Sequence, residues 1–329
     1  MTNQSFHLLA IDGGGTKTQA VITDQEGLLI GEGRAGASNY QVVGRETAVA
    51  TLVASIREAL LNTGVFTKET DDLFDKTLAN DKPIHFKKIV FALAGIDTTN
   101  DESVVREIVI KTLAEIGITY ETLLVENDCL SALLGATQNK AGALLISGTG
   151  SIVFAHDGEG NFFRTGGWGY RVGDEGSGYW IGKEAIRSVL KMKDGREKET
   201  ILLALILKKF GFEKVDDLYS WVYSPAYSVD DVSALTTSVE EAYKMGDEVC
   251  KTILDRAAAE LTLLLEATIE KAGIAQKEFQ LLLQGGVLQN NHYVKEKVLD
   301  CLQKEVDKVS ILHTDEKPIR FIIKRGLAL

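Results

Sequence analysis

The stretch that most constrains this chain is Leu8-Leu9-Ala10-Ile11-Asp12-Gly13-Gly14-Gly15-Thr16-Lys17-Thr18, close to the N-terminus. An apolar run typical of a buried strand stops at one carboxylate, three glycines follow, and a second apolar run begins at Gln19. This order predicts a β-hairpin with a tip formed mainly by glycine. Backbone N–H groups can approach an anion closely there, because glycine has no Cβ and tolerates positive φ. A glycine hairpin without a ligand is the alternative interpretation.

A second copy of this pattern favours the anion site. Leu144-Leu145-Ile146 is again apolar and runs into Ser147-Gly148-Thr149-Gly150-Ser151, followed by another apolar run and an acidic turn at 157–160. Two such hairpins indicate an internal duplication with two loops that face each other across a cleft. Neither loop is a Walker phosphate loop, and neither opens a helix as a dinucleotide-binding fingerprint must.

The rest of the chain alternates strands with helices. Apolar runs predict strands at 28–34, 88–95, 123–126, 162–165, 279–284 and 309–312, and apolar spacing predicts helices at 47–61, 104–116, 129–137, 179–190 and through much of 197–272. An antiparallel hairpin followed by alternating strands and helices predicts an α/β fold with mixed sheets.

Composition restricts the class of protein. The chain has 329 residues, a net charge of −11 and three cysteines, Cys129, Cys250 and Cys301. The charge argues against general binding to nucleic acid or to an anionic membrane. Three scattered cysteines form no disulfide framework, and the N-terminus lacks a signal-peptide pattern, so we expect a cytoplasmic protein.

Two carboxylates are candidates for chemistry. Asp12 would repel a phosphate directly, which makes sense if a divalent cation lies between them, held partly through water as Mg²⁺ prefers. A carboxylate that caps a turn is the alternative. Asp128 follows a strand and starts a helix, a position that faces the crevice of an open sheet and where a carboxylate could accept a hydroxyl proton. Its alternative role is that of a helix N-cap.

The motifs also resemble a known family. The two glycine loops are similar to the phosphate loops of the actin/hexokinase/Hsp70 superfamily, and Gly166-Gly167-Trp168-Gly169 with the run from Gly173 to Gly182 resembles the N-acetylglucosamine kinase branch, which groups with the BadF/BadG-type ATPases. The resemblance implies two duplicated ribonuclease H-like (actin-like ATPase) domains around a central cleft. We expect them at 1–126 and 127–329, with a helical insertion at about 183–245 in the second. The tail from Pro318 departs from the family pattern.

The resemblance also assigns site residues. It implies ATP and Mg²⁺, with the metal near Asp12, Asp128 as the catalytic base, and an amino sugar as substrate. The ATP-binding residues would be Gly13, Gly14, Gly15, Thr16, Lys17, Thr18, Gly148, Thr149, Gly150, Ser151, Gly285 and Gly286. The sugar-binding residues would be Asn39, Asp128, Gly148, Thr149 and Asp174. For Asn39 a simple turn, and for Gly285-Gly286 a helix-start turn, are equally consistent with the residues alone.

The implied activity is phosphorylation of the 6-hydroxyl of N-acetylglucosamine or N-acetylmuramic acid, in amino-sugar metabolism and cell-wall recycling. Related kinases are commonly dimers, so the resemblance implies a homodimer. A glucosamine kinase, or an ATPase that drives a conformational change in a partner, stays open as an alternative. No zinc motif is present, and Cys129, Cys250 and Cys301 are poorly placed for the iron–sulfur cluster of the dehydratase activators.

Overall fold

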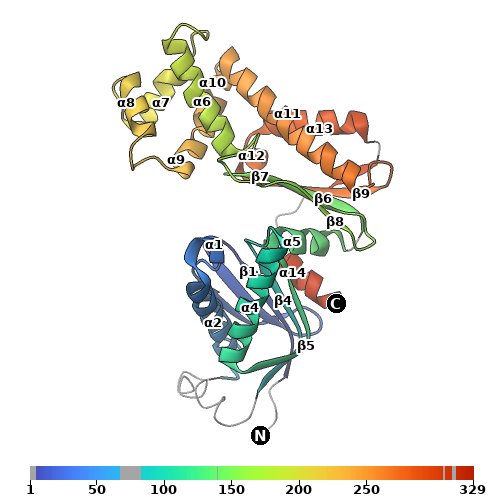
Figure 1. Ribbon diagram of the computed structural model, residues 1–329. Helices are drawn as coiled ribbons and strands as arrows, with labels where there is room; N and C mark the ends of the chain where they lie inside the picture. The colour runs from blue at the N-terminus through green and yellow to red at the C-terminus, as the bar shows by residue number, and fades with distance from the viewer. Residues whose placement is uncertain (1–4, 67–82, 139, 307, 313–315) are drawn as a thin grey trace. The chain divides into compact units, whose positions relative to one another are not determined.

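The computed structural model describes residues 5–66, 83–138, 140–306, 308–312 and 316–329. The chain forms two compact units, one of Met1–Lys140 with Thr314–Leu329 and one of Ala141–His313 (Figure 1). Within the described residues, no helix is both long and apolar enough to cross a membrane.

Unit 1 is built on a five-stranded mixed sheet in the order β3-β2-β1-β4-β5. The central strand β1 pairs antiparallel with β2 and parallel with β4, which pairs parallel with β5. The strands are β1 Ser5–Gly13, β2 Thr18–Thr23, β3 Leu29–Ala35, β4 Ile84–Leu93 and β5 Ile118–Asn127. The helices are α1 Tyr40–Val43, α2 Arg45–Leu61, α4 Thr99–Ile116, α5 Asp128–Thr137 and α14 Pro318–Leu327.

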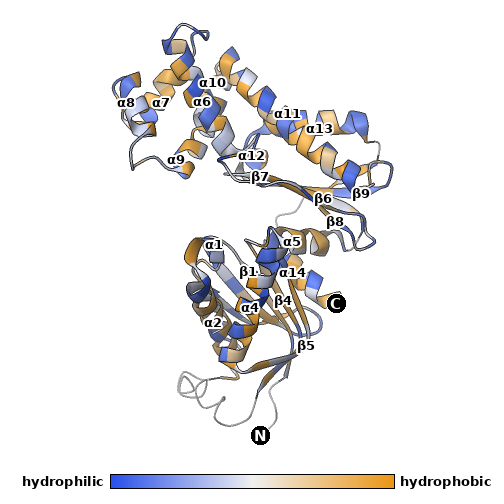
Figure 2. Ribbon diagram, viewed as in Figure 1, coloured by the Kyte–Doolittle hydropathy of each residue, from blue (hydrophilic) through white to orange (hydrophobic). Residues whose placement is uncertain are grey.

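Both faces of this sheet are covered. Side chains alternate between the faces along a strand, so Leu9 and Ile11 of β1 pack with α2 and α4, whereas Leu8 and Ala10 pack with α14. α5 lies beside α14 and contacts β4 and β5. Figure 2 shows hydrophobic residues concentrated along the strands, with hydrophilic residues alternating along the helices.

Unit 2 repeats this topology. Its sheet has the order β10-β9-β6-β7-β8, in which β6 pairs antiparallel with β7 and parallel with β9. The strands are β6 Gly142–Ser147, β7 Ser151–His156, β8 Phe162–Gly166, β9 Phe279–Gln284 and β10 Val309–Ile311. Strand for strand, this is the connectivity of unit 1, which confirms the predicted pair of α/β domains with mixed sheets.

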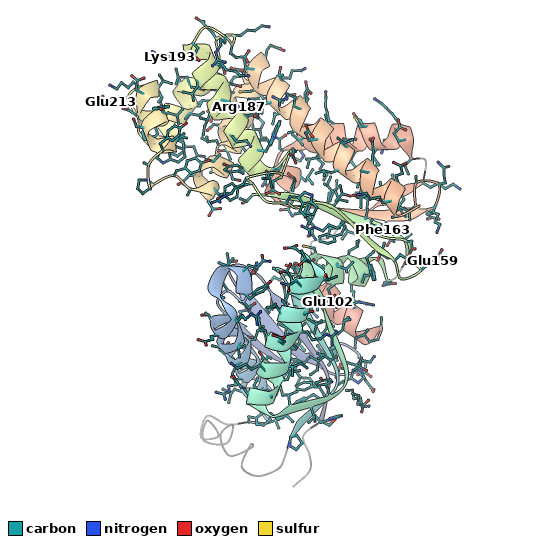
Figure 3. All side chains as sticks on the ribbon, viewed as in Figure 1. Glu102, Glu159, Phe163, Arg187, Lys193 and Glu213 are labelled. Atoms are coloured by element: carbon teal, nitrogen blue, oxygen red, sulfur yellow. The ribbon has the colours of Figure 1, made fainter. Side chains whose placement is uncertain are left out.

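The helices of unit 2 include an insertion between β8 and β9. They are α6 Gly178–Lys193, α7 Leu202–Phe210, α8 Val215–Val222, α9 Val229–Ala234, α10 Thr236–Lys244, α11 Glu248–Lys271, α12 Gly286–Asn290 and α13 His292–Glu305. The insertion shares one apolar core with the sheet, through side chains such as Val232 and Leu254. Lys193 and Glu213, both exposed, project outward from it (Figure 3).

The division into units differs from the one expected after residue 126. α5 and the C-terminal segment belong to unit 1. The physical reason is the apolar face of α14: Ile319, Ile322 and Ile323 are at most 5% exposed and pack on Leu8, Ala10 and Val90 of the sheet. The salt bridge from Arg325 Nε to Glu126 Oε1 (3.1 Å), mostly buried, fixes the end of α14 against β5.

Replacing Ile322 by Ala tests this attachment. Removing a fully buried isoleucine from the interface between α14 and the sheet should lower the free energy of unfolding of unit 1 by about 2–5 kcal/mol. Hydrogen–deuterium exchange should rise in peptides from β1 and β4, while peptides from β6 and β9 keep their protection. Lys111→Ala, which removes an exposed ion pair with Glu115 elsewhere in unit 1, is the control. Increased exchange confined to unit 2 would contradict the assignment of α14 to unit 1.

Candidate functional site

The first glycine loop connects β1 to β2. Gly13 pairs with Thr18, and the Gly14 N–H donates to the carbonyl of Lys17 (3.0 Å), which closes a tight four-residue turn. Gly15, Thr16 and Lys17 are exposed, and a Cβ placed on Gly15 would meet no other atom within 4 Å. The tip therefore presents backbone N–H groups, one hydroxyl and one cation to solvent, as expected of an anion-binding turn.

Two of the predicted loop residues, Gly13 and Thr18, are buried and hold the turn in place through contacts within the protein. Gly13 is buried beneath Ser38 and Leu93. Thr18 is 1% exposed, and its hydroxyl lies 2.9 Å from the carbonyl of Gly36 and 2.8 Å from Ser38 Oγ. The hydroxyl of Thr18 is thus engaged within the protein, and among the two threonines of this loop Thr16 is the one that is free to meet a ligand.

The sheet register brings Asp12 and Asp128 to one edge. Asp12 pairs with Ala92 of β4, the next residue of β4 pairs with Asn127 of β5, and Asp128 follows directly. Asp12 shares the sheet face of Leu8 and Ala10, the face on which α5 packs. The carboxyl ends of parallel strands are where open α/β sheets bind ligands.

Asn127, and not Asp128, is the N-cap of α5. Asn127 Oδ1 accepts hydrogen bonds from the backbone N–H groups of Cys129 (2.9 Å) and Leu130 (3.3 Å). Asp128 occupies the first helical position, where one carboxylate oxygen, Oδ1, accepts from the Cys129 N–H (2.8 Å). The helix is capped without Asp128, which leaves the carboxylate of Asp128 available for another role.

Burial and neighbouring negative charges destabilise the ionised forms of both carboxylates. Burial, reinforced by the charge of Asp128 and opposed by Lys17, raises the pKa of Asp12 to about 6. Burial also raises the pKa of Asp128, assisted by the charge of Asp97 and opposed by the Cys129 N–H. Two desolvated carboxylates that repel each other are typical of a site completed by a cation or a proton.

Asn39 lies next to the first loop. The N–H groups of Ser38 and Asn39 both donate to the Gly14 carbonyl (3.0 and 3.2 Å), so the two loops form one structure. Asn39 Oδ1 caps α1 by accepting from the Gln41 N–H (3.0 Å), and its side chain packs against Gly95, where any Cβ would collide with it. The Asn39 amide nitrogen makes no hydrogen bond within the described residues, so it can donate to a ligand.

The second glycine loop, within unit 2, is a similar turn that is one residue shorter. Ser147 pairs with Ser151, and the Gly148 N–H donates to the Gly150 carbonyl (2.9 Å). Both serines are buried, and their hydroxyls donate to the carbonyls of Gly176 (3.0 Å) and Glu175 (2.8 Å). Thr149 is exposed at the tip. Like Thr18, Ser151 is buried and fixes its loop through a hydrogen bond within the protein.

Gly285-Gly286 lies directly beside this loop. The Cα of Gly285 would be 3.8 Å from a Cβ on Gly148. Gly285 has φ +93°, and any side chain there would collide with the Ser147 carbonyl. The structure therefore brings together two of the three predicted nucleotide-binding elements within unit 2.

Asp174 is placed beneath the second loop. It is 8% exposed and has φ +62°, a left-handed conformation that is rare outside glycine. Its carboxylate accepts from the N–H groups of Ser151 and Gly169 and lies under Gly150. Burial raises the pKa of Asp174. These contacts give Asp174 a clear role in positioning the loop, and its predicted contact with sugar hydroxyls stays a prediction.

A pocket of about 340 Å³ opens beside the second loop. Gly148, Thr149 and Gly286 line one side, and the hydroxyls of Ser233, Thr236 and Thr237, from the helical insertion, line the other. Sequence reasoning missed these hydroxyl residues because they match no motif. The only signal was a short Ser/Thr-rich stretch, 233–238, within a helical region.

The residues at both loops fit the implied ligands. A Mg²⁺ ion near Asp12 would offset the repulsion between two desolvated carboxylates. The described residues contain no group of three or more His, Cys, Asp or Glu side chains able to hold a metal ion alone. Water and phosphate oxygens would therefore complete the coordination, as Mg²⁺ commonly requires. The hydroxyl-lined pocket beside Gly286 suits the nucleoside part of a nucleotide.

Comparison with known proteins agrees with this geometry. The model of the BadF/BadG/BcrA/BcrD ATPase family matches residues 9–318. An N-acetylmuramic acid/N-acetylglucosamine kinase of Clostridium acetobutylicum is 33% identical over 306 residues, 93% of each chain. An N-acetyl-D-glucosamine kinase of Dictyostelium discoideum is 33% identical over 313 residues, 94% of each chain.

A solved structure shares the fold. A candidate N-acetylglucosamine kinase of Chromobacterium violaceum has a TM-score of 0.70 at 20% identity, over 97% of this chain and 98% of that one. This likeness supports the predicted α/β fold of two domains with mixed sheets.

Replacing Asp12 by Asn tests the electrostatics of the strand-end carboxylates. The folded state raises the pKa of Asp12 from 3.8 to about 6, so the wild-type protein loses stability as the pH rises through this interval, and the amide does not. Without metal or nucleotide, Asp12→Asn should therefore be more stable than wild type at pH 7.5, by about 1–3 kcal/mol. The difference should vanish below pH 4.

Urea unfolding at several pH values, with far-UV circular dichroism as the signal, measures this difference. Asp24→Asn, in the exposed β2–β3 turn, is the control for loss of one negative charge. Equal stability of wild type and Asp12→Asn at pH 7.5 would contradict the claim that the folded protein destabilises the ionised form of Asp12.

Proposed function

We propose that this chain, which belongs to the BadF/BadG/BcrA/BcrD ATPase family, is an ATP-dependent kinase of N-acetylated amino sugars. The observation that carries the proposal is Asp128: a desolvated carboxylate at a strand end, relieved of helix capping by Asn127, at the same sheet edge as Asp12 and the first glycine loop. The names of the two relatives at 33% identity support the same activity.

The two glycine loops would bind the ATP phosphates. Gly14, Gly15, Thr16 and Lys17 of the first loop, and Gly148, Thr149 and Gly150 of the second, supply N–H groups, hydroxyls and one cation, while Gly13, Thr18 and Ser151 hold the loops in shape. The nucleoside would occupy the pocket beside Gly285 and Gly286. Phosphoryl transfer depends mainly on such positioning and charge neutralisation.

Asp128 would orient the 6-hydroxyl of the sugar and accept its proton. A raised pKa improves a carboxylate as a base at neutral pH, because its proton affinity lies closer to the working pH. A bound Mg²⁺ would neutralise charge on the phosphates, with Asp12 as its protein contact. Asn39, through its free amide nitrogen, and Asp174 would bind sugar hydroxyls.

The substrate is N-acetylglucosamine, N-acetylmuramic acid or both, with a role in amino-sugar metabolism and cell-wall recycling. A homodimer in the cytoplasm is part of the proposal, supported by the family resemblance and by the acidic, cysteine-poor composition. Glucosamine stays an alternative substrate, and ATP hydrolysis that drives a partner stays an alternative activity. Coupled ADP-release assays across these three sugars and without sugar separate the possibilities.

Asp128→Asn tests the role of the base. Because Asn127 caps α5, the fold should survive, but the amide cannot accept the hydroxyl proton. Sugar phosphorylation should therefore fall by about 10²–10⁴-fold, while the affinity for ATP, measured by calorimetry, changes only a few-fold.

Asp97→Asn is the matched variant. It removes a neighbouring charge that raises the pKa of Asp128, so turnover at pH 8 should persist and the acid limb of the kcat/KM profile should move to lower pH. Wild-type turnover in Asp128→Asn would show that the base lies elsewhere.

Thr149→Val tests the second loop. The Thr149 hydroxyl is exposed at the tip and makes no hydrogen bond within the described residues, so its removal should leave the loop intact. Loss of one hydrogen bond to ATP should raise the KM for ATP about five- to tenfold, and Thr149→Ser should restore it. Identical steady-state constants in all three proteins would exclude Thr149 from the nucleotide site.

A further inference from the structure

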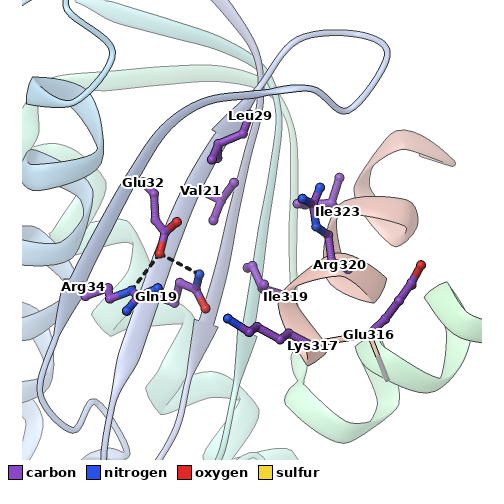
Figure 4. A pocket seen from close by; sticks show the side chains of 10 residues that line it. All are labelled: Gln19, Val21, Leu29, Glu32, Arg34, Glu316, Lys317, Ile319, Arg320 and Ile323. Carbon is purple, nitrogen blue, oxygen red and sulfur yellow. Dashed lines mark hydrogen bonds and ion pairs between the residues drawn. The ribbon is translucent and has the colours of Figure 1, made fainter. Parts of the chain in front are cut away.

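Besides the pocket in unit 2, the structure has a pocket in unit 1 that shares no residue with the candidate site. It has a volume of about 330 Å³ and lies between the β2–β3 edge of the sheet and the start of α14 (Figure 4). We refer to it as the α14 pocket. Its lining residues are Gln19, Val21, Leu29, Glu32, Arg34, Glu316, Lys317, Ile319, Arg320 and Ile323. Its size is that of a small-molecule site.

The α14 pocket has an apolar floor. Val21, Ile319 and Ile323 are at most 5% exposed and belong to the core that joins α14 to the sheet. Leu29, 53% exposed, continues this apolar surface at the rim. A bound hydrocarbon group would rest on this floor and remove the exposed side chain of Leu29 from water.

The rim of the α14 pocket carries three cations, Arg34, Lys317 and Arg320, two of which have no partner among the described residues. Lys317 and Arg320 make no side-chain hydrogen bond or ion pair within the described residues. Arg34 donates from Nε to Glu32 Oε1 (2.7 Å), and its two Nη groups make no hydrogen bond to the residues that the structure describes. In Figure 4 the Lys317 ammonium points across the pocket toward Gln19 and Arg34.

The carboxylates of the rim are already neutralised. Glu32 Oε1 accepts from Arg34 and from Gln19 Nε2 (3.0 Å). Glu316 pairs with Lys324 (2.6 Å), and in Figure 4 its carboxyl group points away from the pocket. Lys317 is the N-cap residue of α14, so its charge lies at the start of this helix. A cationic rim on a chain of net charge −11 selects an anion.

We propose that the α14 pocket binds a small carboxylate with a compact apolar body. The carboxylate would accept hydrogen bonds from Lys317 and from the Nη groups of Arg34, since a guanidinium matches a planar carboxylate, and Arg320 would add a second unpaired cation. The hydrocarbon body would lie on Val21, Ile319 and Ile323. A second copy of this chain fits less well, because a two-fold contact at this surface would bring identical cationic rims together.

Calorimetric titration with 4-methylpentanoate tests the proposal. The full-length protein is first saturated with MgADP, so that the glycine loops are filled and cannot bind the probe. We expect saturable binding with a Kd of about 1 mM or tighter. The neutral isostere 4-methylpentanamide, and inorganic phosphate, which has no apolar body, should each bind about tenfold more weakly or not at all.

The variant Lys317→Ala/Arg320→Ala should weaken binding of 4-methylpentanoate about tenfold or more. Arg106→Ala/Lys111→Ala on α4, which removes two exposed cations from the same unit, should bind as wild type does. Equal affinity in the two double variants, equal affinity for the amide or phosphate, or no binding to wild type at 10 mM (about tenfold above the expected Kd) would overturn the proposal. If the Lys317/Arg320 variant changes its oligomeric state in sedimentation but binds the probe as tightly as wild type, the proposal is overturned in favour of a contact between copies.

Discussion

The site in unit 1 depends on the register of β1. This strand pairs antiparallel with β2 on one side and parallel with β4 on the other, so its carboxyl end meets both a tight glycine turn and the ends of β4 and β5. That register places Asp12 and Asp128 on one edge, where burial and neighbouring negative charges destabilise their ionised forms. The free energy needed to keep two such carboxylates together is what makes this edge suited to a cation and a hydroxyl proton. Unit 2 repeats the strand order but has glycines and hydroxyls at the corresponding edge.

Helix ends and buried hydroxyls determine which residues remain free for a ligand. Asn127 caps α5 and so releases Asp128, while Asn39 caps α1 through its oxygen and keeps its amide nitrogen available. Thr18, Ser147 and Ser151 use their hydroxyls to fix the glycine loops, which leaves the exposed tips preorganised. Preorganised donors are effective in phosphoryl transfer, because they need no rearrangement when charge develops.

Much of the fold was predictable, because each hairpin is a local pattern: apolar run, glycines, apolar run. The positions of the candidate residues, at strand ends and in glycine turns, were predictable for the same reason. Their individual roles were not, since capping by Asn127 or Asp128 differs by one residue, and sequence alone does not show that Thr18 and Ser151 point into the protein. The boundary between units was missed because α14, near the end of the chain, returns to strands from its first third, a contact encoded only in the apolar face of Ile319, Ile322 and Ile323. The hydroxyls at 233–237 were missed because a helical insertion brings them to the pocket without a motif.

The central claim is that the two loops and Asp128 serve transfer of a phosphoryl group to a sugar hydroxyl. Phosphorus NMR of wild-type protein with MgATP and N-acetylglucosamine, N-acetylmuramic acid or their 6-deoxy analogues tests it most directly. The account predicts a sugar phosphate ester in amounts equal to ADP with at least one of the two sugars, and no ester with its 6-deoxy analogue. Release of inorganic phosphate at the same rate with and without sugar, and no ester with either sugar, would contradict it.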